Sequence, residues 1–318
     1  MAGVVEWRAV GTGQLESDPG VYSFSCPLPE EVRALEADLN RNGVLRPLLC
    51  SATGQGGWRV LSGHRRLQWA LAAGLAGIPV AVLEPCGLAR LWDLLLADAL
   101  DHRPLNPVEK GLYLRRRMGC SGESMADLEA AVLPLLEMPP RAAAADDVLW
   151  VSSLPPEVRE GFADGTRPLH AARLLRGAAR EDALAILGAT AGLVGGINKF
   201  TEVVRLLLEC SWRDGLPVRG WLGREGLDRV WQSLDEFRLE ARRLRYPRLS
   251  RQEDTFSRVI DRAGLPPGGG IHAPRGFEGR RYQCRLSFSS LEELRRELKE
   301  TLQCVDEGRL AGLEEFLE

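Results

Sequence analysis

Two hydrophobic periods alternate in the first third of the chain. Short β-prone runs at Leu48–Ser51, Trp58–Ser62 and Ile78–Leu83 predict strands, and the glycine-rich Thr53–Gly57 predicts a hairpin turn between the first two. A further strand is expected at Val4–Val10. This part of the chain is therefore expected to form a sheet.

Helical periodicity connects these strands. Leu67, Ala70, Leu71 and Gly74 follow i, i+3, i+4, i+7 spacing and predict one apolar helix face after Ser62–Arg66. A second helix is expected at Pro29–Asn40, ended by Asn42-Gly43, and a third at Leu88–Leu100.

After Asp101–Pro104 the pattern becomes mainly helical. Asn106, Pro107 and Glu109 form a strong helix start, because asparagine caps the helix and proline suits its first position. Further helices are predicted at Met125–Leu136, Pro139–Ser153, Pro168–Arg176, Glu181–Leu187 and Lys199–Cys210.

The last hundred residues mix both periods. Leu227–Leu244 is predicted as one long amphipathic helix, and Ile271–Phe277 with Arg281–Phe288 as a hairpin around Glu278-Gly279. Ser290 and Glu293 fit a capping box that starts a final helix. We expect a small α+β module here, and a dimer contact is one role for it.

The most chemically specific stretch is Gly63-His64-Arg65-Arg66. A helix start offers free backbone N–H groups and the positive end of the helix dipole, and guanidinium groups bind phosphate oxygens in pairs. Gly63 would let the backbone approach an anion closely. The other interpretation is that one arginine pairs with a carboxylate and braces the fold.

Composition narrows the function classes. The 318 residues carry a net charge of −3, so binding to nucleic acid would need a local basic patch. Seven scattered cysteines without a Cys-x-x-Cys pair argue against a disulfide frame or a zinc site. No signal peptide or membrane-length apolar run is present, so we expect a cytoplasmic protein without a membrane partner.

The order Asn42–Leu49, Ser62–Gly74, Ile78–Glu84 resembles the N-terminal domain of the ParB/Spo0J partition family, also called the ParB-like nuclease or ParB/sulfiredoxin-like domain. Gly43–Pro47 matches the GxxxP box of the family, and Gly63–Arg66 matches its G(E/H)RR-type box. Arg103–Met118 and Leu154–Gly177 resemble the helices that follow in that family.

The resemblance implies a protein that binds CTP with Mg²⁺ and closes on DNA as a clamp. The nucleotide and phosphate candidates, placed on the two boxes, are Gly43, Arg46, Pro47, Gly63, His64, Arg65 and Arg66. No metal-ligating or catalytic residue is assigned.

Two departures from the family pattern matter for the chemistry. The family usually has a basic box near the start, and this chain has Val21–Ser25 there, without an arginine. The family also usually has a metal-linked glutamate where His64 stands, and imidazole is not the oxygen ligand that Mg²⁺ prefers. Hydrolysis of a bound nucleotide therefore stays open.

Related chemistries of the same fold require other residues. A sulfiredoxin needs a cysteine directly before the His-Arg pair, and Gly63 cannot serve as that nucleophile. A free-serine kinase would need a carboxylate base, for which Glu30, Glu31 and Glu36 are candidates. A ParB-like nuclease, another small-molecule phosphotransferase and a non-catalytic partner-binding scaffold remain alternatives.

The segment expected to read DNA in a helix-turn-helix is poor in suitable residues. Arg141 is its one basic side chain, and Asp146 and Asp147 would repel phosphate. We interpret it as a degenerate helix-turn-helix. A second set of DNA candidates lies in an arginine cluster near the end of the long amphipathic helix, at Arg242, Arg243, Arg245 and Arg248.

Together these features predict an α+β domain of ParB/sulfiredoxin type at residues 1–100, a mainly helical, degenerate helix-turn-helix domain at 101–215, and a small α+β module at 216–318. The expected function is that of a bacterial, nucleotide-binding, DNA-associated protein in chromosome or plasmid partition or in transcription regulation. Expected partners are DNA, a ParA-type ATPase and a second copy of the chain.

Overall fold

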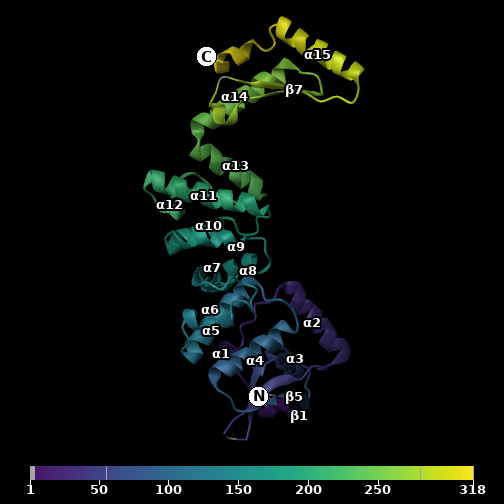
Figure 1. Ribbon diagram of the computed structural model, residues 1–318, viewed down its shortest axis with the longest axis vertical. Coiled ribbons are helices and arrows are strands. Elements are labelled where there is room, and N and C mark those ends of the chain that lie inside the picture. The colour runs from purple at the N-terminus through teal and green to yellow at the C-terminus, as the bar shows by residue number, and fades with distance from the viewer. Residues whose placement is uncertain (1–3, 55, 280, 318) are drawn as a thin grey trace. The chain divides into compact units, whose positions relative to one another are not determined.

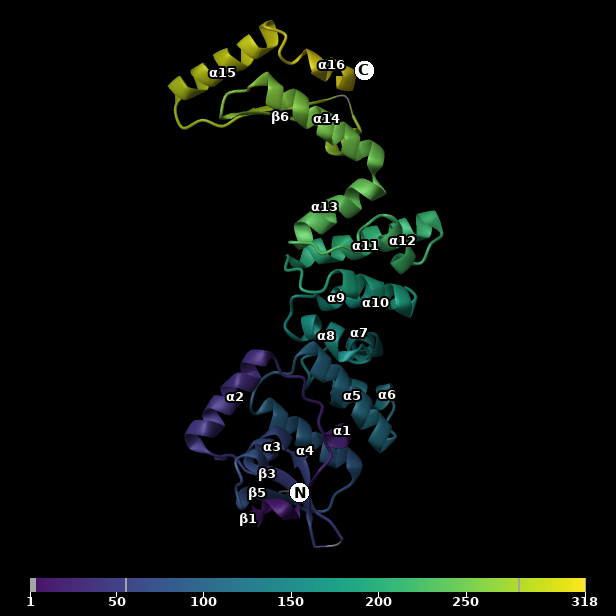
Figure 2. The ribbon, with the colours of Figure 1, turned by 180° about the vertical axis from the view of Figure 1, so that it is seen from behind.

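The computed structural model describes residues 4–54, 56–279 and 281–317. Their contacts divide the chain into two compact units, Met1–Arg205 with Pro217–Asp228, and Leu206–Leu216 with Arg229–Glu318. Figure 1 follows the chain from the purple N-terminal strands to the yellow C-terminal helices, and Figure 2 shows it from behind.

The first unit contains a mixed five-stranded sheet in the order β1-β5-β3-β4-β2. Its strands are β1 (Val4–Gly11), β2 (Leu15–Ser17), β3 (Leu48–Ala52), β4 (Trp58–Ser62) and β5 (Gly77–Leu83). β3 pairs with β5 in parallel, with Leu48 opposite Val80, and pairs with β4 in antiparallel fashion through the predicted hairpin. The predicted strands are confirmed.

Helix α3 (His64–Ala72) packs on this sheet with a narrow apolar face. Leu67 and Ala70 are fully buried against sheet residues such as Leu48 and Val80. Leu71 is 54% exposed, so its prediction as part of the buried face was wrong. The sheet reaches only one side of a helix this short, and Gly74, with φ of +68°, already belongs to the turn that ends it.

The first unit contains further helices before and after α3 in the chain. They are α1 (Pro19–Tyr22), α2 (Pro29–Asn42), α4 (Leu88–Leu100), α5 (Pro107–Ser121), α6 (Met125–Ala131), α7 (Ala142–Ser152), α8 (Pro156–Ala163), α9 (Leu169–Arg176), α10 (Arg180–Ala189) and α12 (Val218–Arg224). Helix α11 (Ile197–Asp214) contributes residues to both units. The predicted helix Met125–Leu136 is shorter than expected, because Val132–Leu136 continue as turns.

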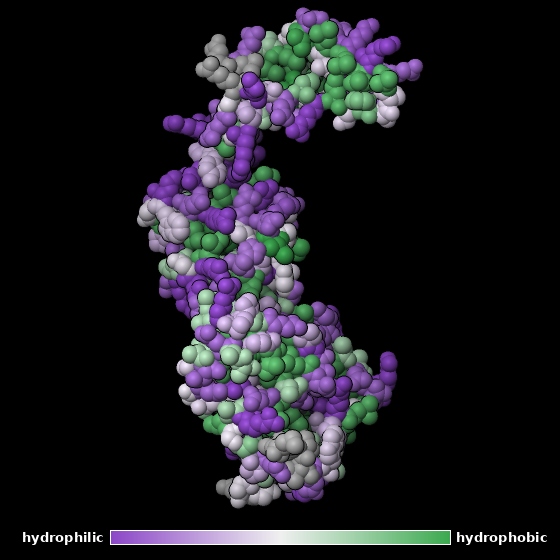
Figure 3. Space-filling model, in the orientation of Figure 1, coloured by the Kyte–Doolittle hydropathy of each residue, from purple (hydrophilic) through white to green (hydrophobic). Residues whose placement is uncertain are grey.

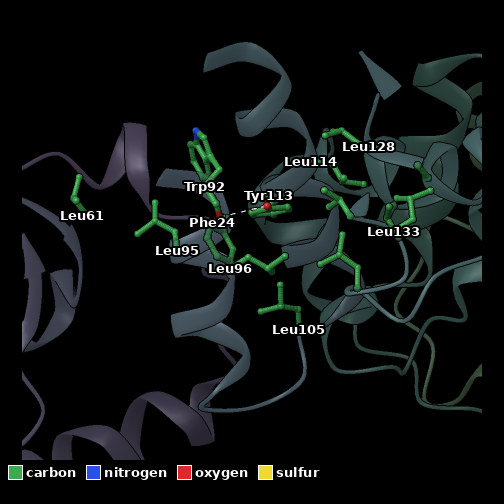
Figure 4. Packing of buried hydrophobic residues seen from close by; sticks show 14 of the residues in the cluster. Phe24, Leu61, Trp92, Leu95, Leu96, Leu105, Tyr113, Leu114, Leu128 and Leu133 are labelled. Atoms are coloured by element: carbon green, nitrogen blue, oxygen red, sulfur yellow. Dashed lines mark hydrogen bonds between the residues drawn. The ribbon is translucent and has the colours of Figure 1, made fainter. Parts of the chain in front are cut away.

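A second apolar core joins α4, α5 and α6 (Figure 4). Trp92 and Tyr113 pack edge to face with ring centroids 5.9 Å apart, and Phe24 packs on Tyr113 at 5.2 Å. The Tyr113 hydroxyl donates to the carbonyl of Trp92 at 3.4 Å. The segment around Phe24 is therefore fixed to the helices by a buried aromatic side chain.

In the second unit, two helices precede a hairpin along the chain and two helices follow it. Its further elements are α13 (Leu234–Arg245), α14 (Pro247–Ala263), β6 (Gly269–His272), β7 (Gln283–Leu286), α15 (Leu291–Asp306) and α16 (Glu314–Leu317). The predicted antiparallel pairing is confirmed, but β6 ends at His272, and Arg275–Phe277 forms a 3₁₀ turn where the first strand was expected to continue. Apolar side chains gather on the visible surface of this C-terminal part (Figure 3).

The single long helix predicted for Leu227–Leu244 is wrong. Gly226 has φ of +67° and Leu227 donates its N–H back to the Leu222 carbonyl, which is how α12 is brought to an end. Helix α13 begins only at Leu234, where the Ser233 hydroxyl caps the N–H of Glu236. Among the described helices, none is long and apolar enough to cross a membrane.

Candidate phosphate-binding site

The turn into α3 depends on a backbone conformation that favours glycine. Gly63 lies between β4 and α3 with φ of +95°, and a Cβ there would stand 2.9 Å from Cγ of Leu48. Gly63 caps α3 without any side-chain hydrogen bond. The N–H groups of the first helical turn therefore have no cap and are suited to an anion.

Arg66 braces this turn against the other sequence box. Its Nη1 donates to the carbonyls of Arg46 at 3.0 Å and Pro47 at 2.9 Å. Gly43, with φ of +70°, leads the chain into that segment, and the Arg46 side chain itself is exposed. The structure thus brings the two boxes together, but through main-chain carbonyls and not through the carboxylate pair considered from sequence.

The side chain of Arg65 differs from that of Arg66 in its contacts. It is half-buried, and within the described ranges it has neither a hydrogen bond nor an ion pair. Burial lowers the pKa of Arg65, and the charges of Glu109 and Glu31 nearby partly oppose that effect. A half-buried cation without a partner is the arrangement expected of a residue that binds an anion from outside the chain.

The carboxylates near Arg65 are occupied by another arginine. Glu109 is only 1% exposed, and its oxygens accept from Arg103 Nη1 at 2.7 Å and Nη2 at 2.8 Å. Arg103 Nε also pairs with Glu31 at 2.7 Å. From the sequence, Glu109 was recognised only as part of a helix start, so this network was missed, because nothing local links Glu31 to it.

The same network holds the segment that lacks the basic box. The Cys26 N–H donates to Glu109 Oε1 at 2.8 Å, and the Asn106 side-chain amide donates to the Cys26 carbonyl at 2.9 Å. Phe24 is buried in the aromatic core. The segment Val21–Ser25 is therefore positioned beside the site by packing and main-chain bonds.

His64 is anchored to the strand before the site through one ring nitrogen. Its Nδ1 lies 2.8 Å from the Ser17 hydroxyl, while Nε2 is buried and has no hydrogen-bond partner within the described part of the chain. Burial lowers the pKa of His64. Among the described residues no group of three or more His, Cys, Asp or Glu side chains is arranged to hold a metal ion.

The helix predicted to read DNA, α7, forms ion pairs with α9 through its two aspartates. Asp147 of α7 is buried and faces Arg173 at 3.4 Å and Arg176 at 3.6 Å, and Asp146 pairs with Arg176 at 2.7 Å. The two aspartates are therefore neutralised by α9. Arg141 precedes the helix and is exposed.

The second predicted DNA set is divided by its contacts. Arg242 pairs with Glu253 at 2.6 Å and Arg245 with Glu209 at 2.9 Å, while Arg243 has a weak 3.5 Å contact to Glu240. Arg248 is exposed and has no carboxylate partner in the part of the chain that is described. Only part of this cluster is free to meet a phosphate backbone.

No protein-family model matches the chain. It is 30% identical to the chromosome-partitioning protein Spo0J of Thermus thermophilus over 232 residues, which cover 68% of this chain and 83% of that protein. A probable chromosome-partitioning protein ParB of Treponema pallidum is 27% identical, over 46% of this chain and 43% of that protein.

A solved structure of C-terminally truncated ParB from Caulobacter crescentus, in complex with CTP-γ-S, is 21% identical and is covered over 97% of its length and 57% of this chain. Its TM-score of 0.27 is too low for a comparison of the structures to carry weight. The sequence match to the Thermus protein is sufficient by itself: this chain belongs to the ParB/Spo0J family of chromosome-partitioning proteins.

Proposed function

We propose that this protein binds a nucleoside triphosphate, with CTP as the first candidate, and associates with DNA in partition. The observation that carries the nucleotide proposal is the half-buried, unpartnered Arg65 beside the uncapped start of α3, within the described part of the chain. Glycine at position 63 leaves the backbone accessible, and Arg66 fixes the turn so that Arg65 is held in place. CTP is preferred because the family resemblance implies it.

At this site Mg²⁺ would be coordinated mainly by the phosphates of the nucleotide. Mg²⁺ commonly keeps several waters and binds through substrate phosphates with only one or two carboxylates. The nearest carboxylates, Glu31 and Glu109, are engaged by Arg103. We therefore expect Mg²⁺ to accompany the nucleotide and not to bind the free protein.

Calorimetric titration of CTP, ATP and GTP into wild type and Arg65→Ala tests the proposal. Removal of a guanidinium that binds phosphate should weaken CTP binding about tenfold or more. Arg33→Ala is the matched control, because Arg33 is an exposed arginine on α2. Absence of binding by folded wild type to all three nucleotides would refute the nucleotide proposal and favour a partner-binding scaffold.

Helix α14 offers the better surface for DNA. Arg248, Arg251, Arg258 and Arg262 are all exposed, and spacings of three, seven and four residues place them on one face of the helix. None of the four has a carboxylate partner within the described segments. Such a stripe suits the phosphate backbone, which is contacted without reading of sequence.

Fluorescence anisotropy with a labelled duplex at several salt concentrations tests this surface. Arg248→Ala with Arg251→Ala should weaken binding and reduce the salt slope by about one for each arginine that no longer meets a phosphate. Arg245→Ala is the comparison, because that guanidinium is already paired with Glu209. Equal slopes in the double variant and wild type would exclude α14 as the DNA-binding surface.

A further inference from the structure

Near one segment of the first unit, two buried side-chain nitrogens have no hydrogen-bond partner among the residues that the structure describes. They are Nε2 of His64 and Nε of Arg159. The His64 ring contacts Ser17, and the Arg159 side chain lies against the thiol of Cys26. The Nε–H of Arg159 is always a donor, and buried donors are almost always paired in folded proteins. Its lack of a partner among the described residues indicates that an acceptor from outside the chain belongs beside residues 17–26.

Three arginines from three helices surround this segment. Arg65 of α3 lies near Cys26, and the Cys26 thiol is in contact with Arg159 of α8. Arg116 of α5 has Arg159 and Asp18 as neighbours and also lies close to His64. Its Nη1 donates to the Pro19 carbonyl at 3.0 Å, which directs Arg116 toward the same segment.

The charge of this ring is not neutralised by the protein. None of the three arginines has an ion pair among the residues that the structure describes. Arg159 Nη1 has only a 3.4 Å contact to the Ser152 carbonyl. Of the nearby carboxylates, Glu31 and Glu109 form salt bridges with Arg103. Asp18 and Glu160 are exposed to solvent.

Several positive charges around one segment fit an oligophosphate better than a single carboxylate or phosphate. Guanidinium groups bind phosphate oxygens in bidentate fashion and stay charged when partly buried. The segment they surround is the one in which the family's basic box is replaced by Val21–Ser25. The helical part thus supplies the cations that this segment lacks.

We propose that Arg116 and Arg159 join Arg65 in holding the triphosphate tail of the nucleotide, in place of the missing basic box. This inference rests on the proposed nucleotide binding. Because Arg159 belongs to α8 and Arg65 to α3, a bound triphosphate links the sheet to the helices beyond it. The ligand then acts as a cross-link within the first unit.

Calorimetry with CTP and with inorganic triphosphate, each with and without magnesium chloride, tests the assignment in wild type, Arg116→Ala and Arg159→Gln. Each variant should bind both ligands at least about tenfold more weakly. Arg115→Ala is the matched control, because Arg115 is the neighbouring residue on α5 and is exposed. Circular dichroism melts establish that each variant is folded.

Hydrogen exchange of wild type provides a readout that needs no substitution. Bound CTP should slow amide exchange in α8 as well as at the start of α3. Lack of protection in α8 with CTP bound would overturn the inference, as would wild-type affinity in folded Arg116→Ala and Arg159→Gln while Arg65→Ala binds nothing. That second result would leave the proposed function standing, whereas a wild type that binds neither ligand would overturn both.

Discussion

Arg65 and Arg66 are adjacent in the chain but differ in role. The guanidinium of Arg66 donates hydrogen bonds to the carbonyls of Arg46 and Pro47. Replacement of Arg66 should therefore destabilise the turn into α3. Arg65 makes no such bond among the described residues, so its replacement should spare the fold and remove ligand affinity. This contrast makes Arg65, and not Arg66, the informative position for binding experiments.

His64 should make stability depend on pH below neutrality. Burial lowers its pKa from the ordinary value of 6.5. As the pH falls below 6.5, the unfolded chain binds a proton at this position that the folded chain does not yet bind. Its contribution to stability is therefore complete above that pH and is lost as the pH falls toward the lowered pKa.

Thermal melts between about pH 7 and pH 5 check this expectation. The melting temperature of wild type should fall more steeply than that of His64→Gln, which has no group titrating at this position. Carboxylates with lowered pKa values, such as Glu123 and Glu253, lose their contribution at lower pH and are common to both proteins. Parallel curves would show that His64 does not titrate differently in the folded state.

At the scale of elements, α7 is a packing helix. It lies between α5 and α9, and it approaches α5 so closely at Gly111 that a Cβ there would stand 2.0 Å from the Val148 carbonyl oxygen. Val148 and Val151 are fully buried on the same helix. Close packing of this kind gives α7 a structural role within the first unit.

Gly111→Ala should therefore destabilise the protein by about 3 kcal/mol or more, because two helix backbones must move apart. Gly119→Ala on the same helix is the control, since a Cβ there meets nothing within 4 Å. That change should be neutral or stabilise by up to about 1 kcal/mol, as alanine is the better helix former. Urea denaturation measures both, and similar effects of the two changes would contradict the close approach of the helices.

At the scale of the whole molecule, two compact units each carry part of the proposed function. The first unit holds the candidate nucleotide site, and the second holds the basic face of α14. Helix α15 in the second unit buries Glu297 and Cys304 but leaves a stripe of apolar residues exposed. These residues are Leu291 at 80%, Leu298 at 52%, Leu302 at 60% and Val305 at 54% exposed.

We propose that this α15 stripe is the interface of a homodimer, since large exposed apolar side chains at helical spacing usually mark an interaction surface. Light scattering after size-exclusion chromatography should show a dimer for wild type and a monomer for Leu298→Glu with Leu302→Glu. Leu71→Glu on α3 is the control, because Leu71 is similarly exposed in the other unit. A monomeric wild type, or a double variant that stays dimeric, would refute this interface.

Sequence by itself determined the features that depend on neighbouring residues. Strands β1, β3, β4 and β5, the Gly63 turn and the Asn106 cap are predicted from hydrophobic period, glycine and capping signals, and the structure confirms them. The short edge strand β2 is not predicted, because three residues carry too little periodicity. Helix α14 was missed although Pro247 stands at its first position and Gly264 follows its end in a left-handed conformation. Those signals were present, but the arginines between them were interpreted only as a cluster of charge.

The division into three domains stays a prediction, as do the site assignments themselves.

Tertiary structure alone decided which charged groups are free of ion pairs. Arg65 and Arg242 look alike in sequence, yet Glu253 pairs with Arg242, and Arg103 occupies the carboxylates beside Arg65. Local signals fix helices and turns because capping and backbone strain act within a few residues. Ion pairs between residues far apart in the sequence form only when folding brings their helices together, so no local sequence pattern predicts them.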